Sequence, residues 1–464
     1  MFSKEVYVNR RNRLKQLMGN DGILLFLGNS EAAANYTSNT YKFRQDSTFL
    51  YFFGLNEPDF AAVIDLATGK ETLFGNDVTM DDIIWMGPQP KVSEKAEWIG
   101  ADDSKTMADL ATVVGDAVKA GRRVHYLPPY RNHNKIMLNA MLGIPFGELS
   151  AKASMEMIKA CVSLRELKDK LEIAELDEVA KVGYAMHHTA MEMAKLGMRE
   201  QDIAGFMEGI ACQGGAMVSF ATILSQHGET LHNHDHSGIL TDGRMLLIDA
   251  GAESNTNYCS DNTRTFPASG KFTQRQKDVF NIVAAANNHA MSMSRPGITY
   301  KEVHLAACRV LAQGLKDLGL MKGDVDEAVA AGAHALFMPH GLGHQMGIDV
   351  HDMEDYGETN VGYDDKVKRS TQFGLSALRM GKELKVGHVV TDEPGCYFIP
   401  ALIEKWKHEG INTQFINFDK LESFYDFGGV RLEDDILITE TGCRLLGPKR
   451  LPITVEEIEA VMAK

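Results

Sequence analysis

Histidine and glycine are concentrated in residues 337–352. The segment holds three histidines within twelve residues, His340, His344 and His351. Three glycines lie among them, and glycine at that density lets the backbone approach a ligand closely and disfavours a long helix. We therefore expect the histidines to be displayed on a loop or a short strand. Any one of them alone would more often be solvated or packed in a core.

Single acidic residues stand at predicted strand ends on both sides of this segment: Asp249 and Asp261 before it, Glu393 and Glu433 after it. Four carboxylates gathered at one point would repel, and some would stay protonated at neutral pH unless cations compensate them. With the imidazole of His344 they form an oxygen-rich set of five ligands. That set suits two divalent cations, manganese first, with iron, cobalt or zinc as alternatives. Two such ions, about 3.5 to 4 Å apart, hold a hydroxide between them as the nucleophile of a hydrolysis.

The same residues also have more ordinary interpretations. His340-x-x-x-His344 has half the pattern of a zincin helix, but Gly341 stands where the glutamate belongs and the glycines oppose a helix. Each acidic residue by itself would more often be a turn, a cap or a paired strand carboxylate. The run from His232 to His236 is dense enough in histidine to resemble a metal-binding segment, yet such a loop is more often solvated. We expect a role for His232 alone.

Size and composition restrict the class of protein. A chain of 464 residues is too long for one compact core, so we expect two domains. The net charge of −15 argues against a nucleic-acid partner or an anionic membrane surface. Charged residues near the N-terminus replace the apolar core of a signal peptide, and no apolar stretch approaches the roughly 18 residues of a membrane span. We therefore expect a cytoplasmic protein. The six cysteines lack framework spacing, so we expect reduced thiols.

The elements of the first 150 residues predict a small mixed α/β unit. A helix is expected over residues 5–18, a buried strand over 22–27, a hairpin from 61–65 and 71–74, and a strand over 125–127. The aromatic residues between 49 and 53 are expected in the core. The boundary with the next domain should lie between residues 150 and 165.

The second part of the chain must position the acidic residues and the histidines. A long amphipathic helix is expected from Arg165 onward, residues 217–224 look β-like, and an apolar strand over 245–248 leads into Asp249. Capping boxes at Thr273 and Thr299 begin two helices, and a third is expected over 325–336. Strands are expected over 388–392 and 429–439, with Arg431 and Glu433 on one face of the latter. Residues 354–385 and 400–428 are expected to be irregular.

These residues resemble the proline-specific metallopeptidases of the pita-bread fold, prolidase and aminopeptidase P. The resemblance covers essentially the whole chain and implies a small creatinase/prolidase-type N-terminal domain (1–160), followed by a pita-bread catalytic domain (161–464). It also implies a homodimer and the same five metal ligands. Asp392 departs from the pattern, because these relatives usually have an apolar residue there. The motifs that carry the resemblance are Ile248-Asp249-Ala-Gly251, Ser260-Asp261-Asn-Thr-Arg264, Met338-Pro-His340-Gly-Leu-Gly-His344, Asp349-Val-His351-Asp352, Thr391-Asp-Glu393-Pro-Gly395 and Gly429-Val-Arg431-Leu-Glu433-Asp-Asp435.

The implied activity is hydrolysis of the Xaa-Pro bond by the metal-bridged hydroxide. That bond is a tertiary amide without an N–H, so peptidases that bind this hydrogen are poorly suited to it. The segment 374–379 lies in an insertion resembling that of prolidase, which favours Xaa-Pro dipeptides as substrates. The alternative is an Xaa-Pro aminopeptidase acting on longer peptides. Relatives that lack metals, such as creatinase or binding modules, form a further class, which the complete ligand set argues against.

The resemblance also implies roles around the metals. Glu393 would shuttle the proton to the proline nitrogen, while His351 and His232 would stabilise the oxyanion or orient the substrate. His340 would lie behind the ligands or face the substrate. Arg379 would bind the C-terminal carboxylate, and together with Arg431 it would favour a free C-terminus. For Arg379, an ordinary surface cation is an equally good interpretation.

Overall fold

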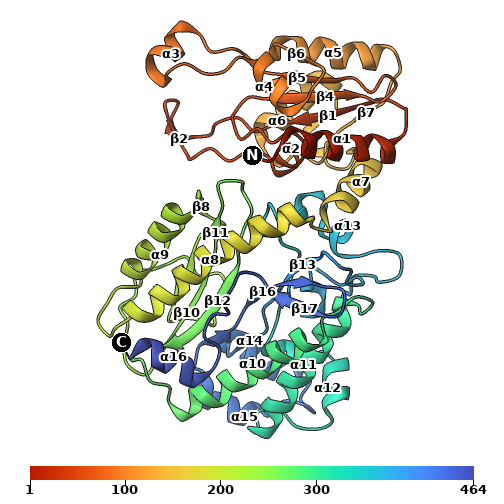
Figure 1. Ribbon diagram of the computed structural model, residues 1–464. Coiled ribbons are helices and arrows are strands. Elements are labelled where there is room, and N and C mark those ends of the chain that lie inside the picture. The colour runs from red at the N-terminus through yellow and green to blue at the C-terminus, as the bar shows by residue number, and fades with distance from the viewer. Residues whose placement is uncertain (464) are drawn as a thin grey trace. The chain divides into compact units, whose positions relative to one another are not determined.

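The computed structural model describes residues 1–463, which divide into two compact units of mixed helices and strands, as the predicted α/β class requires (Figure 1). One unit consists of residues 1–165 together with 353–360. The other consists of the remaining described residues, 166–352 and 361 onward. The short return segment 353–360 means that the first unit is built from two separate stretches of the chain.

A five-stranded sheet forms the centre of the first unit. Its order is β6-β5-β4-β1-β7, with β1 antiparallel to β4, β4 antiparallel to β5, and both outer strands parallel to their neighbours. The predicted hairpin is confirmed as β4 and β5, in which Ala61 pairs with Phe74. The bounds are β1 (Ile23–Leu27), β4 (Ala61–Asp65), β5 (Glu71–Phe74), β6 (Asp103–Lys105), β7 (Val124–His125) and, in a separate ribbon, β2 (Ala33–Tyr36) and β3 (Asn39–Thr40).

Helices surround this sheet, and one of them carries the predicted aromatic core. Helix α2 begins where the Asp46 carboxylate accepts the backbone N–H of Phe49, and all seven of its residues are buried. The buried guanidinium of Arg11 on α1 donates to the Glu71 carboxylate at 2.7 Å and to two backbone carbonyls. The bounds are α1 (Lys4–Met18), α2 (Ser47–Phe53), α3 (Met80–Met86), α4 (Val92–Ile99), α5 (Met107–Lys119), α6 (Asn132–Leu142) and α7 (Met155–Arg165).

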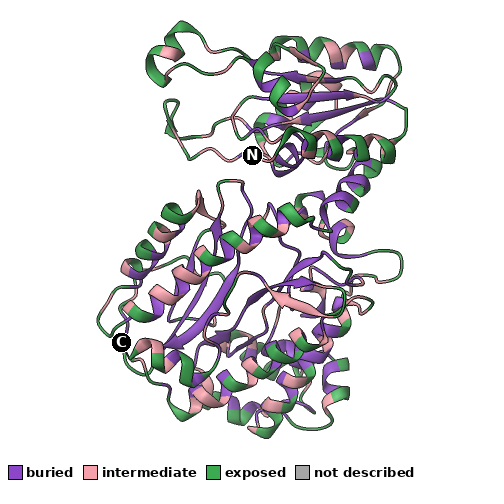
Figure 2. Cartoon of the chain, viewed as in Figure 1, coloured by how far each residue is buried: buried purple, intermediate pink, exposed green. Residues whose placement is uncertain are grey.

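Short buried strands form the interior of the second unit (Figure 2). Strands β10 and β12 are buried over their full length and pair antiparallel, with β9 on the other side of β10. Two further groups, β13-β16-β17 and β14-β15, carry the C-terminal motifs. The bounds are β8 (Met217–Val218), β9 (Ile223–Ser225), β10 (Met245–Ala250), β11 (Ala252–Glu253), β12 (Asn262–Pro267), β13 (Val389–Asp392), β14 (Gly395–Tyr397), β15 (Gly429–Arg431), β16 (Asp434–Ile438) and β17 (Cys443–Leu445).

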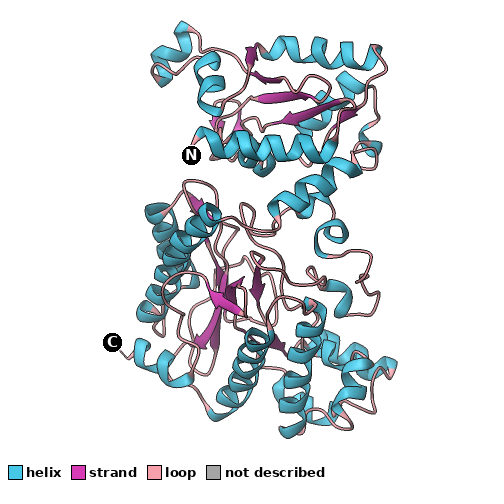
Figure 3. Cartoon of the chain, turned by 45° about the vertical axis from the view of Figure 1, so that its right-hand side comes forward, coloured by secondary structure: helices cyan, strands magenta, loops and turns pink. Residues whose placement is uncertain are grey.

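Helices cover these strands on both sides (Figure 3). Helix α8 packs against β10 and β12, and α10 packs against β13, β14 and β15. The predicted capping boxes are confirmed, because the hydroxyls of Thr273 and Thr299 accept N–H groups at the starts of α10 and α11. The bounds are α8 (Lys170–Met193), α9 (Glu200–Gly214), α10 (Gln274–Met293), α11 (Tyr300–Asp317), α12 (Val325–Ala330), the 3-10 turn η2 (Ala333–Leu336), α13 (Glu358–Gly362), which begins in the first unit, α14 (Pro400–Glu409), α15 (Phe418–Leu421) and α16 (Val455–Met462).

Two sequence-based expectations about elements were wrong. Residues 400–428 are not irregular throughout, since α14 begins with Pro400 at its first turn and ends at Gly410 in the left-handed conformation. Proline at the start and glycine past the end are the signals of such a helix. The expected strand 429–439 is two strands, because the chain changes partners at Leu432 and Glu433, from β14 to β13.

None of the helices within residues 1–463 is long and apolar enough to cross a membrane. All six cysteines are free thiols, four of them buried.

Candidate metal centre

The hairpin of β10 and β12 positions the first two acidic residues. Asp249 lies near the end of β10, in register with Thr263 of β12, and Asp261 immediately precedes β12. The chain turns between them at Gly251, where a Cβ atom would lie 1.7 Å from the Ser260 carbonyl oxygen. Only glycine fits so close an approach, so the turn that brings the two carboxylates together depends on it.

The segment 337–352 is a loop, one of the two forms that were predicted, and it docks along β13. The backbone N–H of Thr391 donates to the His344 carbonyl at 3.0 Å, and the His344 N–H donates to the Thr391 hydroxyl at 3.1 Å. The Glu393 N–H donates to the Leu342 carbonyl at 2.8 Å. A Cβ atom at Gly343 would lie 2.1 Å from the Thr391 carbonyl oxygen. These contacts fix the His344 imidazole relative to the Glu393 carboxylate.

The break between β15 and β16 brings the last motif to the hairpin. At the break, the Glu433 N–H donates to the Thr263 carbonyl at 3.0 Å. The Thr263 hydroxyl donates to Glu433 Oε2 at 2.7 Å and accepts from Arg431 Nε at 3.1 Å. Arg431 and Glu433 therefore meet at one hydroxyl, and both reach the side of the site that holds Asp249 and Asp261.

All five predicted ligand residues converge in the second unit. His344 Nε2 lies 3.4 Å from Asp261 Oδ2 and 3.8 Å from Glu393 Oε1. One donor atom each of Asp261, His344 and Glu433 falls within 4.8 Å of the others. Nδ1 of His344 lies 3.0 Å from the Gln345 carbonyl, so it carries the proton and leaves the Nε2 lone pair directed at the carboxylates. This is the arrangement that a metal ion requires of a histidine.

The electrostatics of the site call for cations. Burial raises the pKa of the Asp261 and Glu433 carboxyls well above their ordinary values, and neighbouring carboxylates add to the rise. Burial also raises the pKa of Glu393 to about 7, against the opposing charge of His344. Among the described residues, Oδ1 of Asp249 and Oδ1 of Asp261 are buried without a hydrogen-bond partner. Buried acceptors left unpaired are costly, so the residues present fit bound divalent cations.

Arg431 is the cation already in place. It is buried, and its Nη2 donates to Asp249 Oδ2 at 2.7 Å while Nη1 donates to the Tyr397 hydroxyl at 2.8 Å. The Tyr397 hydroxyl lies 3.0 Å from His340 Nε2, and His340 Nδ1 lies 2.8 Å from the Gly341 carbonyl. Burial lowers the pKa of His340 to about 4, so this imidazole is neutral, with both nitrogens engaged by protein groups. His340 therefore sits beside the carboxylate cluster as an orienting group.

The three remaining predicted residues lie around the same cluster. The His351 ring contacts that of His344, with 4.0 Å between the centroids and the ring planes tilted by 51°. Partial burial of the His232 ring lowers its pKa, and the charges of Arg431 and Asp249 also act on that pKa. Arg379 is partly buried, and its positive charge is one of those that act on Glu393.

Four further residues belong to the site and were not predicted. The Thr263 and Thr391 hydroxyls donate to the Glu433 and Glu393 carboxylates, and Tyr397 joins Arg431 to His340. Asp435 accepts the Asp261 N–H at 2.9 Å, and burial raises the pKa of its carboxyl. Alternation along the expected strand puts 431, 433 and 435 on one face, so this signal could have found Asp435. No comparable pattern singles out the two threonines or the tyrosine.

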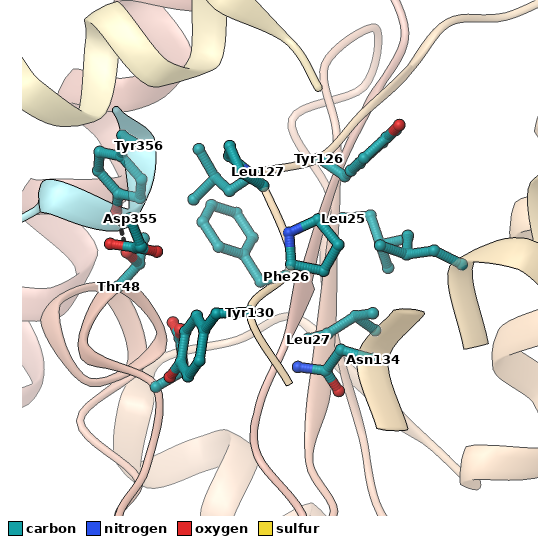
Figure 4. Close-up of a pocket in the computed structure, with 14 residues that line it drawn as sticks. Leu25, Phe26, Leu27, Thr48, Tyr126, Leu127, Tyr130, Asn134, Asp355 and Tyr356 are labelled. Carbon is teal, nitrogen blue, oxygen red and sulfur yellow. Dashed lines mark hydrogen bonds between the residues drawn. The ribbon is translucent and has the colours of Figure 1, made fainter. Parts of the chain in front are cut away.

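The first unit has a pocket of its own, and none of the residues that line it is a predicted site residue (Figure 4). Phe26, Leu127 and Tyr130 line it together with Asp355 and Tyr356 of the return segment. Its accessible volume is ≈ 40 Å³, which holds a water molecule or two and no peptide.

Comparison with known proteins agrees with this geometry. Residues 174–440 match metallopeptidase family M24, and residues 7–126 match the N-terminal domain of aminopeptidase P. The chain is 34% identical to the human Xaa-Pro dipeptidase, covering 98% of this chain and 92% of that protein. It is 32% identical to a probable Xaa-Pro aminopeptidase of Fusarium vanettenii, covering 91% and 88% respectively.

Solved structures give the same result. The aminopeptidase PepP of Pseudomonas aeruginosa superposes with a TM-score of 0.80 at 28% identity, covering 100% of this chain and 98% of that one. The zinc-substituted aminopeptidase P of Escherichia coli in complex with product superposes with a TM-score of 0.81 at 29% identity. The chain thus combines an aminopeptidase P type N-terminal domain with a metal-dependent catalytic domain, and it belongs to metallopeptidase family M24.

Proposed function

We propose that this enzyme hydrolyses the peptide bond that precedes proline, with Xaa-Pro dipeptides as its preferred substrates. The convergence of His344 Nε2 with the carboxylates of Asp261 and Glu393, at 3.4 and 3.8 Å, carries this proposal. The relatives named Xaa-Pro dipeptidase and Xaa-Pro aminopeptidase support the choice of bond. Hydrolysis of an Xaa-Pro dipeptide by the purified protein, followed by proline release, tests it directly.

We infer that two divalent cations are held by Asp249, Asp261, His344, Glu393 and Glu433, with manganese as the native metal. When bound, the ions polarise the scissile carbonyl and supply an activated water. Four carboxylates and one imidazole form a hard donor set, which supports manganese over a metal that prefers sulfur ligands. Elemental analysis of the protein purified without added metal is the test, and a stoichiometry near two would support the inference.

The surrounding side chains have separate tasks in this proposal. Glu393 takes up the proton of the attacking water at its carboxylate and delivers it to the proline nitrogen, while the Thr391 hydroxyl, 3.3 Å from Oε1, holds it in position. His351 and His232 stabilise the oxyanion or orient the substrate. Replacing Glu393 by Gln should abolish turnover and leave the fold intact. Turnover retained in E393Q would defeat this assignment.

Selection of dipeptides would come from Arg379, together with Arg431. A guanidinium beside the site can bind the C-terminal carboxylate of a dipeptide in a bidentate manner. In support of this, the charge of Arg379 acts on Glu393. R379L should raise KM for an Xaa-Pro dipeptide by at least about tenfold, because losing a contact of about 1.4 kcal/mol weakens binding tenfold. The same substitution should change KM for an Xaa-Pro-Yaa tripeptide much less.

Xaa-Pro aminopeptidase activity on longer peptides is the second candidate, because several relatives and the matched structures carry that name. Comparing kcat/KM for an Xaa-Pro dipeptide and the matching Xaa-Pro-Yaa tripeptide decides between the two. A higher value for the tripeptide would assign the protein to the aminopeptidase group.

Three further features complete the proposal. A domain boundary at residue 160 agrees with family matches that end at 126 and resume at 174. A homodimer is supported by the apolar side chains that α3 exposes, since an exposed apolar patch is typical of a protein interface. They are Met80, Ile84, Trp85 and Met86, and light scattering would test the oligomeric state. A cytoplasmic location is supported by the six free thiols, which suit a reducing compartment.

A further inference from the structure

A second cluster of metal-binding side chains lies in the catalytic unit, apart from the five ligand residues. His304 and Cys308 stand one turn apart on α11, so they share one face of the helix. His334 faces them from η2. One donor atom of each residue lies within 4.8 Å of the others, and the two imidazole rings meet edge to face with 6.2 Å between centroids.

The cluster is enclosed in apolar surroundings. His304 and Cys308 have no exposed surface and His334 is 1% exposed. Cys308 belongs to the same hydrophobic core as Ala333 and Leu336. Neither ring nitrogen of His334 has a hydrogen-bond partner anywhere in residues 1–463. An unpaired buried polar group costs about 1 to 3 kcal/mol of folding free energy. A cation that accepts the imidazole lone pair would offset this cost.

We propose that His304, Cys308 and His334 form a second metal site, which binds one soft d10 cation, Zn²⁺ or Cu⁺, through two imidazoles and a thiolate. Bond lengths of about 2.3 Å to sulfur and 2.05 Å to nitrogen place the two donors about 3.6 Å apart at a tetrahedral angle. The observed distance from Cys308 Sγ to His304 Nε2 is 3.5 Å. Two of the three ligands thus already have the required spacing, and His334, whose donor atom lies within 4.8 Å of theirs, must move closer to complete it.

The chemistry of this site differs from that of the carboxylate centre. One sulfur and two nitrogens prefer soft cations, whereas four carboxylates prefer hard ones. Binding breaks the Cys308 S–H bond, forms the sulfur–metal bond and releases one proton to the solvent. Both histidines are already neutral at pH 7, because burial lowers the pKa of His304 to about 3 and of His334 to about 4. Each therefore offers a lone pair without losing a proton.

Charge balance favours the monovalent cation. A thiolate with Cu⁺ is neutral, whereas a thiolate with Zn²⁺ leaves one net positive charge in a dry core. The nearby Lys301 adds a positive charge that acts on His304, whereas His334 and His340 are neutral at pH 7. We therefore expect Cu⁺ to compete successfully with Zn²⁺ for this site.

The site would link α11 to the segment that carries His340 and His344. Turn η2 ends at Leu336, and the histidine segment begins at the next residue. A bound cation would fix the start of that segment without touching substrate. Its existence is independent of which peptide the enzyme cleaves.

A thiolate-specific spectrum tests the proposal. Full-length protein is refolded separately with Zn²⁺, Cu⁺ or Co²⁺, because a buried site must be filled as the chain folds. Sulfur-to-metal charge-transfer absorption with Co²⁺ distinguishes this cluster from the carboxylate centre, since none of the five residues of that centre carries sulfur. We expect about one equivalent of thiolate-bound Co²⁺ per wild-type chain, displaced by Zn²⁺ and more readily by Cu⁺.

Matched variants complete the experiment. C308S and H334Q should lose the absorption, whereas C161S, which alters a buried cysteine on α7, should retain it. Absence of the absorption from wild-type protein folded with Co²⁺, or its persistence in C308S, overturns the proposal. If C308S fails to fold, H334Q serves in its place, and absence of the absorption from the wild type overturns the proposal without any variant. A water molecule bound in place of a cation would also give no absorption and would count against the site.

Discussion

The Arg431 guanidinium donates through Nη2 to Oδ2 of Asp249, with 2.7 Å between the atoms. The same group also reaches the hydroxyls of Thr263 and Tyr397. This one residue therefore neutralises a carboxylate of the candidate metal centre and orients the hydroxyls that contact Glu433 and His340. Its planar fork with several donors is what allows all of these contacts at once.

Replacing Arg431 by Lys should lower kcat/KM by about 100-fold or more, because an ammonium cannot serve three acceptors that lie in different directions. R431M should in addition lower the free energy of unfolding by about 3 to 5 kcal/mol, since Asp249 is left buried without its partner. Steady-state kinetics and urea unfolding measure the two effects. R199K is the matched control, because Arg199 pairs with Asp202 at the surface and should change neither quantity. Wild-type kinetics in R431K would contradict the role given to the several donors of the Arg431 guanidinium.

Replacing Gly343 by Ala should weaken metal binding and activity together by at least about tenfold. The new Cβ would lie 2.1 Å from the Thr391 carbonyl oxygen, so His344 and β13 must separate. Isothermal titration with Mn²⁺ and a peptidase assay measure the two effects. G209A is the control: Gly209 lies within α9 with open space around its Cβ position, so alanine should leave activity unchanged and stabilise the helix by about 0.5 to 1 kcal/mol. Unchanged metal affinity in G343A would show that this close approach is not required.

Removing divalent cations should reduce activity by at least about 100-fold and lower the melting temperature. Without cations, the buried carboxylates of Asp261, Glu393 and Glu433 must share protons or repel one another. Dialysis against a chelator, with residual metal measured by elemental analysis, provides the sample. Added Mn²⁺ should restore both activity and melting temperature. Full activity in a sample shown to be metal-free would rule out the metal-dependent mechanism.

The ion pair of Asp65 and Arg122 should make the stability of the first unit depend on pH. Two Arg122 donors lie 2.7 and 2.9 Å from the carboxylate, and this hydrogen bonding holds the pKa of Asp65 below its ordinary value. The stabilisation is therefore complete above the unfolded pKa of about 3.9 and is lost as the pH falls through the folded pKa. D65N should cost about 1 kcal/mol at pH 7, a value reduced for partial exposure, and nothing at low pH.

Amide hydrogen exchange of peptides spanning β1 and β4, compared with wild type at each pH, would show this difference. D116N is the control, because Asp116 and its partner Lys119 are both exposed and lie 3.7 Å apart. A D65N effect that stays constant from pH 7 to pH 3 would contradict the assignment.

The sequence alone determined the local elements and the type of chemistry. Threonines three residues ahead of glutamine or glutamate predicted the starts of α10 and α11, and two short strand-like runs separated by a turn signal predicted the hairpin of β4 and β5. These signals are local, since each depends on neighbours within a few residues. The ordered acidic and histidine motifs predicted a metal-dependent hydrolase of the correct family. The roles of the individual ligands remain predictions.

Only the tertiary structure decided how these residues meet. The strand expected over 429–439 divides at Leu432 and Glu433 because two different partner strands, β14 and β13, compete for it. Thr263, Thr391 and Tyr397 enter the site through contacts with residues far along the chain. His334 faces Cys308 only because η2 packs against α11. Hydrogen bonds and packing between distant segments leave no periodic trace in a single sequence, which is the physical reason that these features required the folded chain.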